Sequence, residues 1–241
     1  MLAIEGLTRR FGGLEALSGV DYAVAGEGVF GLIGPNGSGK TTLFNVVTGL
    51  YRPSAGRVRF LGEDISRLGP HRIIAKGIAR TFQTPRVYAR MTVRENLAAA
   101  RHTLAGAERR AGGEARIAAL LEATGLADRR DELAKSLPLP EQRRLELARA
   151  LVRNPRLLLL DEPAGGMTPA ETQAMARLIE EVAAPGRACI VIEHKMDMIA
   201  RLCAQVCVLN FGAKIAEGAP DAVLNDPVVL EAYIGRDGGG A

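Results

Sequence analysis

The chain has 241 residues, of which 47% are hydrophobic and 24% are charged, a composition typical of a soluble globular protein. Its formal net charge is only +4, too small to indicate nucleic-acid binding by itself. No stretch approaches the ~18 uninterrupted apolar residues of a membrane span, and the opening MLAIEGLTRRFGG has its charges in the wrong order for a secretory signal.

The first third of the chain predicts β-structure around one short helix. Apolar and β-branched residues cluster between glycines in LAIEGLT (2–8) and in VDYAVAGEGVFGLIG (20–34), which indicates strands. The pattern becomes helical from Lys40 to Val47. GRVRFLGEDI (56–65) alternates like an exposed hairpin strand.

Residues 84–155 have a different composition, rich in Ala, Arg, Glu and Leu at helical spacing. This window holds 14 lysines and arginines against 9 aspartates and glutamates, an excess of 5 positive charges. We predict a single domain over 1–241, with a helical subdomain at 84–155 inserted into a core of 1–83 and 156–241.

Strands and helices alternate again after residue 155. Near-continuous aliphatic strands separated by helices predict a mostly parallel sheet covered on both faces. The closing DGGGA is expected to be a frayed tail. The expected strands are RLLLLD (156–161), ACIVIEH (188–194), AQVCVLN (204–210) and AKIAEG (213–218), and the expected helices are TPAETQAMARLIEEVA (168–183) and KMDMIARLC (195–203).

The cysteines and histidines predict neither a disulfide framework nor a zinc site. An odd number of cysteines without metal-type spacing is typical of buried, reduced thiols in a cytosolic protein. The histidines are too far apart in sequence to suggest a cluster. These six residues are Cys189, Cys203, Cys207, His71, His102 and His194.

The segment GPNGSGKTT matches the phosphate-loop pattern G-x-x-x-x-G-K-[ST]. It follows an apolar strand and opens a helix, where backbone N–H groups and the helix dipole favour phosphate. Lys40 would reach the β- and γ-phosphates of a nucleotide, and the Thr41 hydroxyl would ligate Mg²⁺. The predicted loop comprises Gly34, Pro35, Asn36, Gly37, Ser38, Gly39, Lys40, Thr41 and Thr42.

LLLLDEP (157–163) is an aliphatic strand that ends in two acids. Such a strand places Asp161 at the carboxyl edge of the sheet, where open α/β sheets bind ligands. We expect Asp161 to hold Mg²⁺ through water. Glu162 would then polarise a water against the γ-phosphate.

These motifs, in this order, resemble the ATP-binding subunits of ABC transporters over nearly the whole chain. The resemblance implies a P-loop NTPase (RecA-like) α/β core with a mostly parallel sheet, an antiparallel β subdomain and an inserted α-helical subdomain. It also implies ATP and Mg²⁺ as ligands, with hydrolysis by in-line attack of water.

Four further segments occupy family positions. Gln83 in RTFQTPRVYARMTVREN is similar to the glutamine-loop residue, which touches Mg²⁺ and the attacking water. His194 in IVIEHKMD resembles the switch histidine that hydrogen-bonds the γ-phosphate. Phe11 stands where the family stacks an aromatic ring on adenine. AGGMTPAE (164–171) occupies the D-loop, although Thr168, Pro169 and Glu171 also form a helix start by sequence alone.

The likeness is greatest to the family's branched-chain amino-acid uptake type, the LivG type. It is carried by FGGLEALSGVDY, GIARTFQTPRVYARMTVRENL, IEHKMDM and NDPVVLEAYIG. It implies a second ATP-binding subunit, two membrane permease subunits and, indirectly, a solute-binding protein as partners, with no nucleic acid. The chain would then lie in the cytoplasm, peripherally on the inner face of the cell membrane.

The segment SLPLPEQRRLELARAL occupies the place of the family's LSGGQ-type signature, which starts a helix that caps the nucleotide of the other subunit. Pro138 replaces a serine-type position, and Pro140 removes a backbone N–H. A lost donor to phosphate weakens such a site by about tenfold to a hundredfold. Proline suits the first helical turn, so the helix should still form. The signature residues are Leu137, Pro138, Leu139, Pro140, Glu141 and Gln142.

This departure predicts an asymmetric heterodimer, in which the nucleotide on this chain is hydrolysed and the opposite one is turned over less well. Four alternatives remain at this point. Two stay within the family: a regulatory module that binds ATP and scarcely hydrolyses it, and an ATPase subunit for another solute. The others are an ABC-type ATPase acting on nucleic acid and a small-molecule P-loop kinase.

Overall fold

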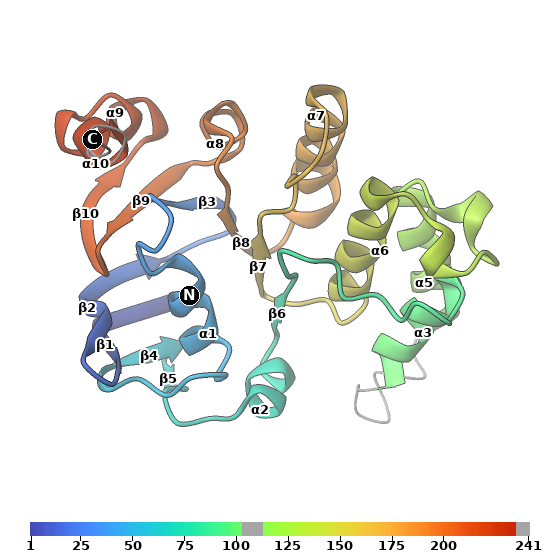
Figure 1. The fold of residues 1–241 in the computed structure, drawn as a ribbon. Helices are drawn as coiled ribbons and strands as arrows, with labels where there is room; N and C mark the ends of the chain where they lie inside the picture. The colour runs from blue at the N-terminus through green and yellow to red at the C-terminus, as the bar shows by residue number, and fades with distance from the viewer. Residues whose placement is uncertain (103–112, 235–241) are drawn as a thin grey trace.

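The computed structural model describes residues 1–102 and 113–234 of the chain, so the predicted DGGGA tail lies outside the described residues (Figure 1). Its larger sheet has six strands in the order β10-β9-β3-β8-β7-β6. Strands β6 to β9 and β3 pair in parallel, and only β10 is antiparallel to its neighbour. The strands are β3 (Gly28–Ile33), β6 (Ile78–Arg80), β7 (Leu157–Asp161), β8 (Ala188–Ile192), β9 (Gln205–Asn210) and β10 (Ala213–Gly218).

The predicted mostly parallel sheet is therefore confirmed. Strand β6 is an addition that the sequence pattern did not indicate, because it has only three residues and no alternation to detect. It forms the edge of the sheet beside β7 and leads directly into Gln83.

A second sheet is antiparallel, with the order β2-β1-β4-β5. Strand β1 continues three residues beyond the predicted range, and the predicted run 56–65 is divided by a turn. Leu61 and Gly62 make that turn with positive φ angles of 52° and 84°. The strands are β1 (Leu2–Phe11), β2 (Leu14–Val24), β4 (Ala55–Phe60) and β5 (Glu63–Asp64).

Both faces of the six-stranded sheet are covered, and each face has its own apolar core. Successive residues of β7 alternate between the two cores, with Leu158 and Leu160 on one side and Leu157 and Leu159 on the other. The second core contains α1 (Lys40–Val47) and the antiparallel sheet.

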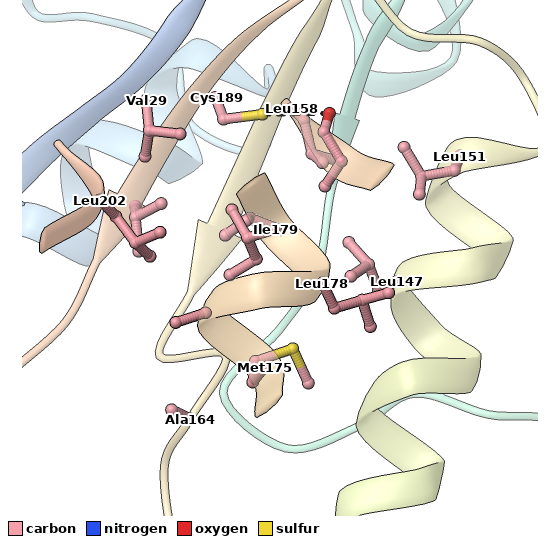
Figure 2. Close-up of a cluster of buried hydrophobic side chains, with 14 of the residues drawn as sticks. Val29, Leu147, Leu151, Leu158, Ala164, Met175, Leu178, Ile179, Cys189 and Leu202 are labelled. Carbon is pink, nitrogen blue, oxygen red and sulfur yellow. Dashed lines mark hydrogen bonds between the residues drawn. The ribbon is translucent and has the colours of Figure 1, made fainter. Parts of the chain in front are cut away.

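The first core joins the sheet to helices that are distant in sequence. Figure 2 shows Leu158 and Cys189 of the sheet beside Met175, Leu178 and Ile179, with Leu147 and Leu151 of α6 across from them. The chain elements on this face are α6 (Leu139–Leu151), α7 (Pro169–Leu178), η3 (Ile179–Ala183) and α8 (Met196–Leu202). Helix α6 is thus packed against the same core as β7.

Helix α7 begins as the sequence predicts. The Thr168 hydroxyl accepts a hydrogen bond from the Glu171 N–H, and the Glu171 carboxylate accepts one from the Thr168 N–H, which makes a capping box. The predicted helix 168–183 changes to a π-helical turn at Ile179–Ala183. The Arg187 guanidinium donates to the carbonyls of Val182 and Ala183 at the end of this turn.

The predicted helical window contains α3 (Val93–His102), α5 (Gly113–Ala123) and α6, which lie together at one end of the molecule beyond β6 (Figure 1). Pro138 is the N-cap of α6 and Pro140 lies in its first turn, so the prediction that prolines permit this helix is confirmed. The other helices of the described residues are α2 (Pro70–Ala75), α9 (Pro220–Leu224) and α10 (Pro227–Ile234), with short 3₁₀ turns at Ala127–Arg129 and Ala134–Ser136.

Two predictions about the chain as a whole can be compared with the structure. All three cysteines are free and buried, as expected. Burial raises the pKa of Cys189, Cys203 and Cys207 to about 12 each. Over the described ranges, none of the helices has the length and apolarity needed to cross a bilayer.

Candidate functional site

The predicted phosphate loop forms the connection between β3 and α1, and two of its glycines are sterically required. Gly34 has φ 146°, and a Cβ there would lie 2.0 Å from the Leu209 carbonyl oxygen. Gly39 has φ 107°, and its Cβ would lie 2.7 Å from the Ala16 carbonyl oxygen. The neighbouring strands therefore lie so close to the loop that only glycine fits at these two positions.

The ammonium group of Lys40 lies inside the arch of this loop. Its Nζ donates to the carbonyl oxygens of Gly34 at 2.6 Å and Pro35 at 2.9 Å, with Ser38 Oγ at 3.4 Å. The side chain is almost fully buried, at 6% exposed. A cation enclosed by a loop at a helix N-terminus is arranged to attract a multiply charged anion.

A cavity of about 470 Å³ opens over the loop and brings together residues from five separate segments. It contains most of the phosphate loop and four further predicted site residues. The aromatic ring predicted to stack on adenine lies at its edge, beside Leu14 and Ala16. The lining residues are Phe11, Leu14, Ala16, Asn36, Gly37, Ser38, Gly39, Lys40, Thr41, Thr42, Gln83, Glu162 and His194.

Glu162 is the point at which three segments meet. Its Oε2 accepts a hydrogen bond from Gln83 Nε2 at 3.0 Å, and its Oε1 lies 3.2 Å from His194 Nε2. The backbone of Glu162 has a φ of 48°, a left-handed conformation that costs a non-glycine residue about 1–3 kcal/mol. The surrounding hydrogen bonds hold it there, including Glu162 N–H to the Ile192 carbonyl at 2.9 Å.

Asp161 ends β7 one residue earlier and is only 4% exposed. It lines a neighbouring cavity of about 450 Å³ together with Thr41 and Gln83. A buried carboxylate and a threonine hydroxyl around one space are oxygen donors of the kind that Mg²⁺ prefers. The residues present therefore fit the expected metal.

Arg80 is a residue of the candidate site that sequence reasoning missed. Its Nη2 donates to Asp161 Oδ2 at 2.7 Å and its Nη1 donates to Asn45 Oδ1 at 2.6 Å. The two charged side chains are 6% and 5% exposed, so this is a buried ion pair. The signal in the sequence was an arginine directly before the Gln83 loop. Its ion pair with Asp161 could not be predicted without knowing that β6 and β7 are neighbours in the sheet.

Glu193 was also missed, although it stands directly before His194. It is 2% exposed, and its carboxylate accepts hydrogen bonds from the N–H groups of Ala164 at 2.8 Å and His194 at 3.1 Å. Lys195 adds a second connection, because its Nζ donates to the Met167 carbonyl at 2.9 Å. The histidine segment and the predicted D-loop are therefore joined from both sides. An acid that ends an otherwise aliphatic strand was the signal in the sequence.

Phe11 lies at the end of β1 with 37% of its surface exposed. The Arg9 guanidinium lies 4.3 Å from the centroid of its ring, and Tyr51 packs against it edge-on at 5.1 Å. These contacts fix the ring at the rim of the cavity above the phosphate loop.

The predicted signature residues 137–142 line neither of these two cavities. Pro138 and Pro140 contribute no N–H groups at the start of α6, and the N–H of Glu141 is directed to the Pro138 carbonyl at 3.0 Å. The Gln142 side chain donates to the Leu137 carbonyl at 2.8 Å. Glu141 Oε2 pairs with Arg129 Nε at 3.2 Å.

Comparison with known proteins identifies the family and agrees with the fold. Residues 17–165 match the family model of ABC transporters, and residues 213–238 match the model described as branched-chain amino acid ATP-binding cassette transporter. Two solved ATP-binding cassettes of ABC transporters, one free of nucleotide and one in an ADP conformation, superpose with TM-scores of 0.87 at 33% identity. These superpositions cover 97% and 98% of this chain and 98% of each cassette.

The chain therefore belongs to the ABC transporter family, as one of its ATP-binding subunits. Within the family it is 41% identical to the high-affinity branched-chain amino acid transport ATP-binding protein BraF of Pseudomonas aeruginosa. It is 39% identical to LivG of Escherichia coli, which carries the same description. Both matches cover 98% of this chain and 98% of the relative.

Proposed function

We propose that this chain is the ATP-hydrolysing subunit of an importer for branched-chain or related amino acids, and that it powers uptake through partner membrane subunits. The observation that carries this proposal is end-to-end similarity to BraF and LivG, including the separate match at residues 213–238. The C-terminal match is informative because it lies outside the general cassette match at 17–165.

ATP binds with its phosphates on the loop from Gly34 to Thr42. The Lys40 ammonium exchanges loop carbonyls for the β- and γ-phosphate oxygens, which the enclosed charge favours. Phe11 stacks on the adenine at the far end of the cavity. Thr41 and Asp161 would hold Mg²⁺, and the bound metal would supply positive charge that offsets the charge developing on the phosphate oxygens.

Hydrolysis is assisted by the group around Glu162. Its carboxylate accepts a hydrogen bond from the attacking water, and the contacts from Gln83 and His194 fix its orientation. His194 would then hydrogen-bond the γ-phosphate, and Gln83 would contact the attacking water and the bound metal. Most of the rate acceleration comes from this positioning and from electrostatic stabilisation, because phosphoryl transfer needs little covalent help.

The functional assembly contains a second ATP-binding subunit and two permease subunits, and receives solute from a solute-binding protein. This chain attaches to the cytoplasmic face of the membrane through the permeases. Pro138 and Pro140 remove donors from the signature that faces the partner's nucleotide, so the partner differs from this chain and supplies an intact signature. The two sites then hydrolyse ATP at unequal rates.

The test is reconstitution of the chain with its co-purifying membrane subunits and the solute-binding protein in liposomes. ATP-dependent accumulation of labelled leucine is expected, with no accumulation of an unrelated sugar. No uptake of any branched-chain amino acid despite ATP hydrolysis would contradict the assigned substrate. Pro140→Gly should raise turnover at the partner's site, and unchanged turnover at both sites would contradict the asymmetry.

A further inference from the structure

Helix α6 holds the glutamine loop through a row of three charged side chains. Arg143, Glu146 and Arg149 are spaced three residues apart and all bond to the backbone of residues 82–86. Glu146 Oε1 accepts hydrogen bonds from the N–H groups of Phe82 at 3.3 Å and Arg86 at 2.9 Å. Arg149 donates to the Arg86 carbonyl.

Arg143 is the member of this row that also reaches Glu162. Its Nη2 donates to the Gln83 carbonyl at 3.0 Å and its Nη1 donates to the Glu162 carbonyl at 2.8 Å. The residue is only 7% exposed, so water competes little for these bonds. One guanidinium therefore joins α6 to the backbones of two residues whose side chains meet in the cavity.

We propose that Arg143 is a positioning residue for hydrolysis. It holds the Glu162 and Gln83 side chains in the relative positions that hydrolysis needs, and it makes those positions depend on the position of α6. This inference rests on the proposed ATPase function. It assigns Arg143 no contact with nucleotide, since Arg143 lines neither cavity of the site.

The backbone of Glu162 explains why such a residue is needed. A left-handed φ of 48° is unfavourable for glutamate and persists only when neighbouring groups hold it. The Glu162 carbonyl accepts from Arg143 and from the Gly165 N–H at 3.0 Å. Without the guanidinium, the peptide after Glu162 loses one of these two restraints, and the carboxylate can turn away from Gln83 and His194.

The same bonds give the two nucleotide sites of a dimer a route of communication. The N-terminal end of α6 is the signature, which faces the partner's nucleotide in the proposed assembly. Leu147 and Leu151 pack the helix into the core beside β7 (Figure 2). A shift of α6 that follows events in the partner's site therefore moves Gln83 and Glu162 through Arg143.

The assembled transporter provides the test, with Arg143→Met, Arg143→Lys and a matched control, Arg116→Met. Arg116 is a suitable control because it also donates to two carbonyls, those of Leu151 at 2.8 Å and Val152 at 2.9 Å, at the end of α6 opposite the signature. Arg143→Met should lower kcat for ATP by about 10- to 100-fold, since misplacement by about 1 Å has effects of that size. The KM for ATP and the affinity for nucleotide should stay within twofold.

Arg143→Lys should recover part of kcat, because the lysine ammonium keeps the charge and can still donate, although it lacks the forked geometry of the guanidinium. Gly165→Ala tests the same contact with Arg143 in place. The added Cβ would lie 3.1 Å from Arg143 Nη2 and 3.3 Å from the Glu162 carbonyl oxygen. The variant should therefore lower kcat without changing KM.

Three results would overturn the inference: a loss of kcat no greater in Arg143→Met than in Arg116→Met, a parallel rise in KM, or full activity in both Arg143→Met and Gly165→Ala. Absence of ATP hydrolysis in the wild-type complex would instead contradict the proposed function. The wild-type measurement therefore separates the two failures.

Discussion

His194 Nε2 lies 3.2 Å from Glu162 Oε1, although the two residues are 32 positions apart in the sequence. The contact follows from the sheet, because β7 and β8 are parallel neighbours in which Asp161 pairs with Ile192. The residues that follow each strand therefore leave the sheet at the same edge. Glu162 is held from the opposite side by Gln83, so its carboxylate is fixed before any water arrives.

Glu162→Gln should abolish most ATP hydrolysis while nucleotide binding is retained. Glutamine preserves the size of the side chain but cannot accept a proton from water, and loss of such a group lowers rates by about 10²- to 10⁴-fold. Single-turnover hydrolysis and nucleotide affinity in the assembled complex would be measured together. Glu180→Gln, on the surface, is the control. A variant that keeps more than about a tenth of the wild-type rate would contradict the role of Glu162.

Arg80→Met should destabilise the nucleotide-free protein strongly. The substitution leaves Asp161 as a buried carboxylate without its counter-ion, which costs about 3–5 kcal/mol. The free energy of unfolding from urea denaturation would measure this change.

Arg201→Met is the matched control for Arg80→Met. It breaks an ion pair with Glu180 whose side chains are 44% and 36% exposed, and pairs of that kind contribute about 0–1 kcal/mol. Equal losses of unfolding free energy in the two variants would show that burial of the Arg80 pair has no special effect. MgATP should restore part of the stability of Arg80→Met, because the metal replaces the missing positive charge.

Glu146→Gln should stabilise the protein increasingly as the pH rises. Burial raises the pKa of Glu146 above its ordinary 4.5, and the hydrogen bonds from Arg86 and Phe82 only partly oppose this effect. Between the two pKa values the native state therefore binds more protons than the unfolded state, and its stability falls as pH rises. Glutamine removes this ionisation while its oxygen still accepts both hydrogen bonds.

The measurement for Glu146→Gln is Tm from pH 4 to pH 8 for the wild type and the variant. The difference in Tm should be smallest at pH 4 and should grow above pH 4.5 until Glu146 is fully ionised in the native state. A difference that is constant across this range would contradict the effect of burial on the carboxylate.

The three cysteines should resist alkylation in the folded protein. Their pKa values of about 12 leave almost no thiolate at pH 8, and the thiols are buried. Mass spectrometry after iodoacetamide treatment should show unmodified native protein and three added groups after denaturation. Rapid labelling of any cysteine in the native state would contradict the packing of β8, β9 and the end of α8.

Local features of this protein were determined by the sequence alone. The helix Lys40–Val47, the cap at Thr168, the buried strand at 157–161 and the prolines at the start of α6 were all predicted correctly. Each depends on periodicity, on turn chemistry or on a motif that spans a few residues. The phosphate loop belongs to this group, because its glycines and lysine are consecutive in the chain.

Only the tertiary structure decided how the candidate site is connected. The pairs Arg80–Asp161 and Gln83–Glu162 join residues 81 and 79 positions apart, and the bonds of Arg143 to Gln83 and Glu162 span 60 and 19. Such contacts follow from the strand order β3-β8-β7-β6 and from the packing of α6. Neither of these can be predicted from a local pattern in the sequence. A buried arginine has the same sequence signature as one on a solvated face, so only its neighbours in space reveal what it holds.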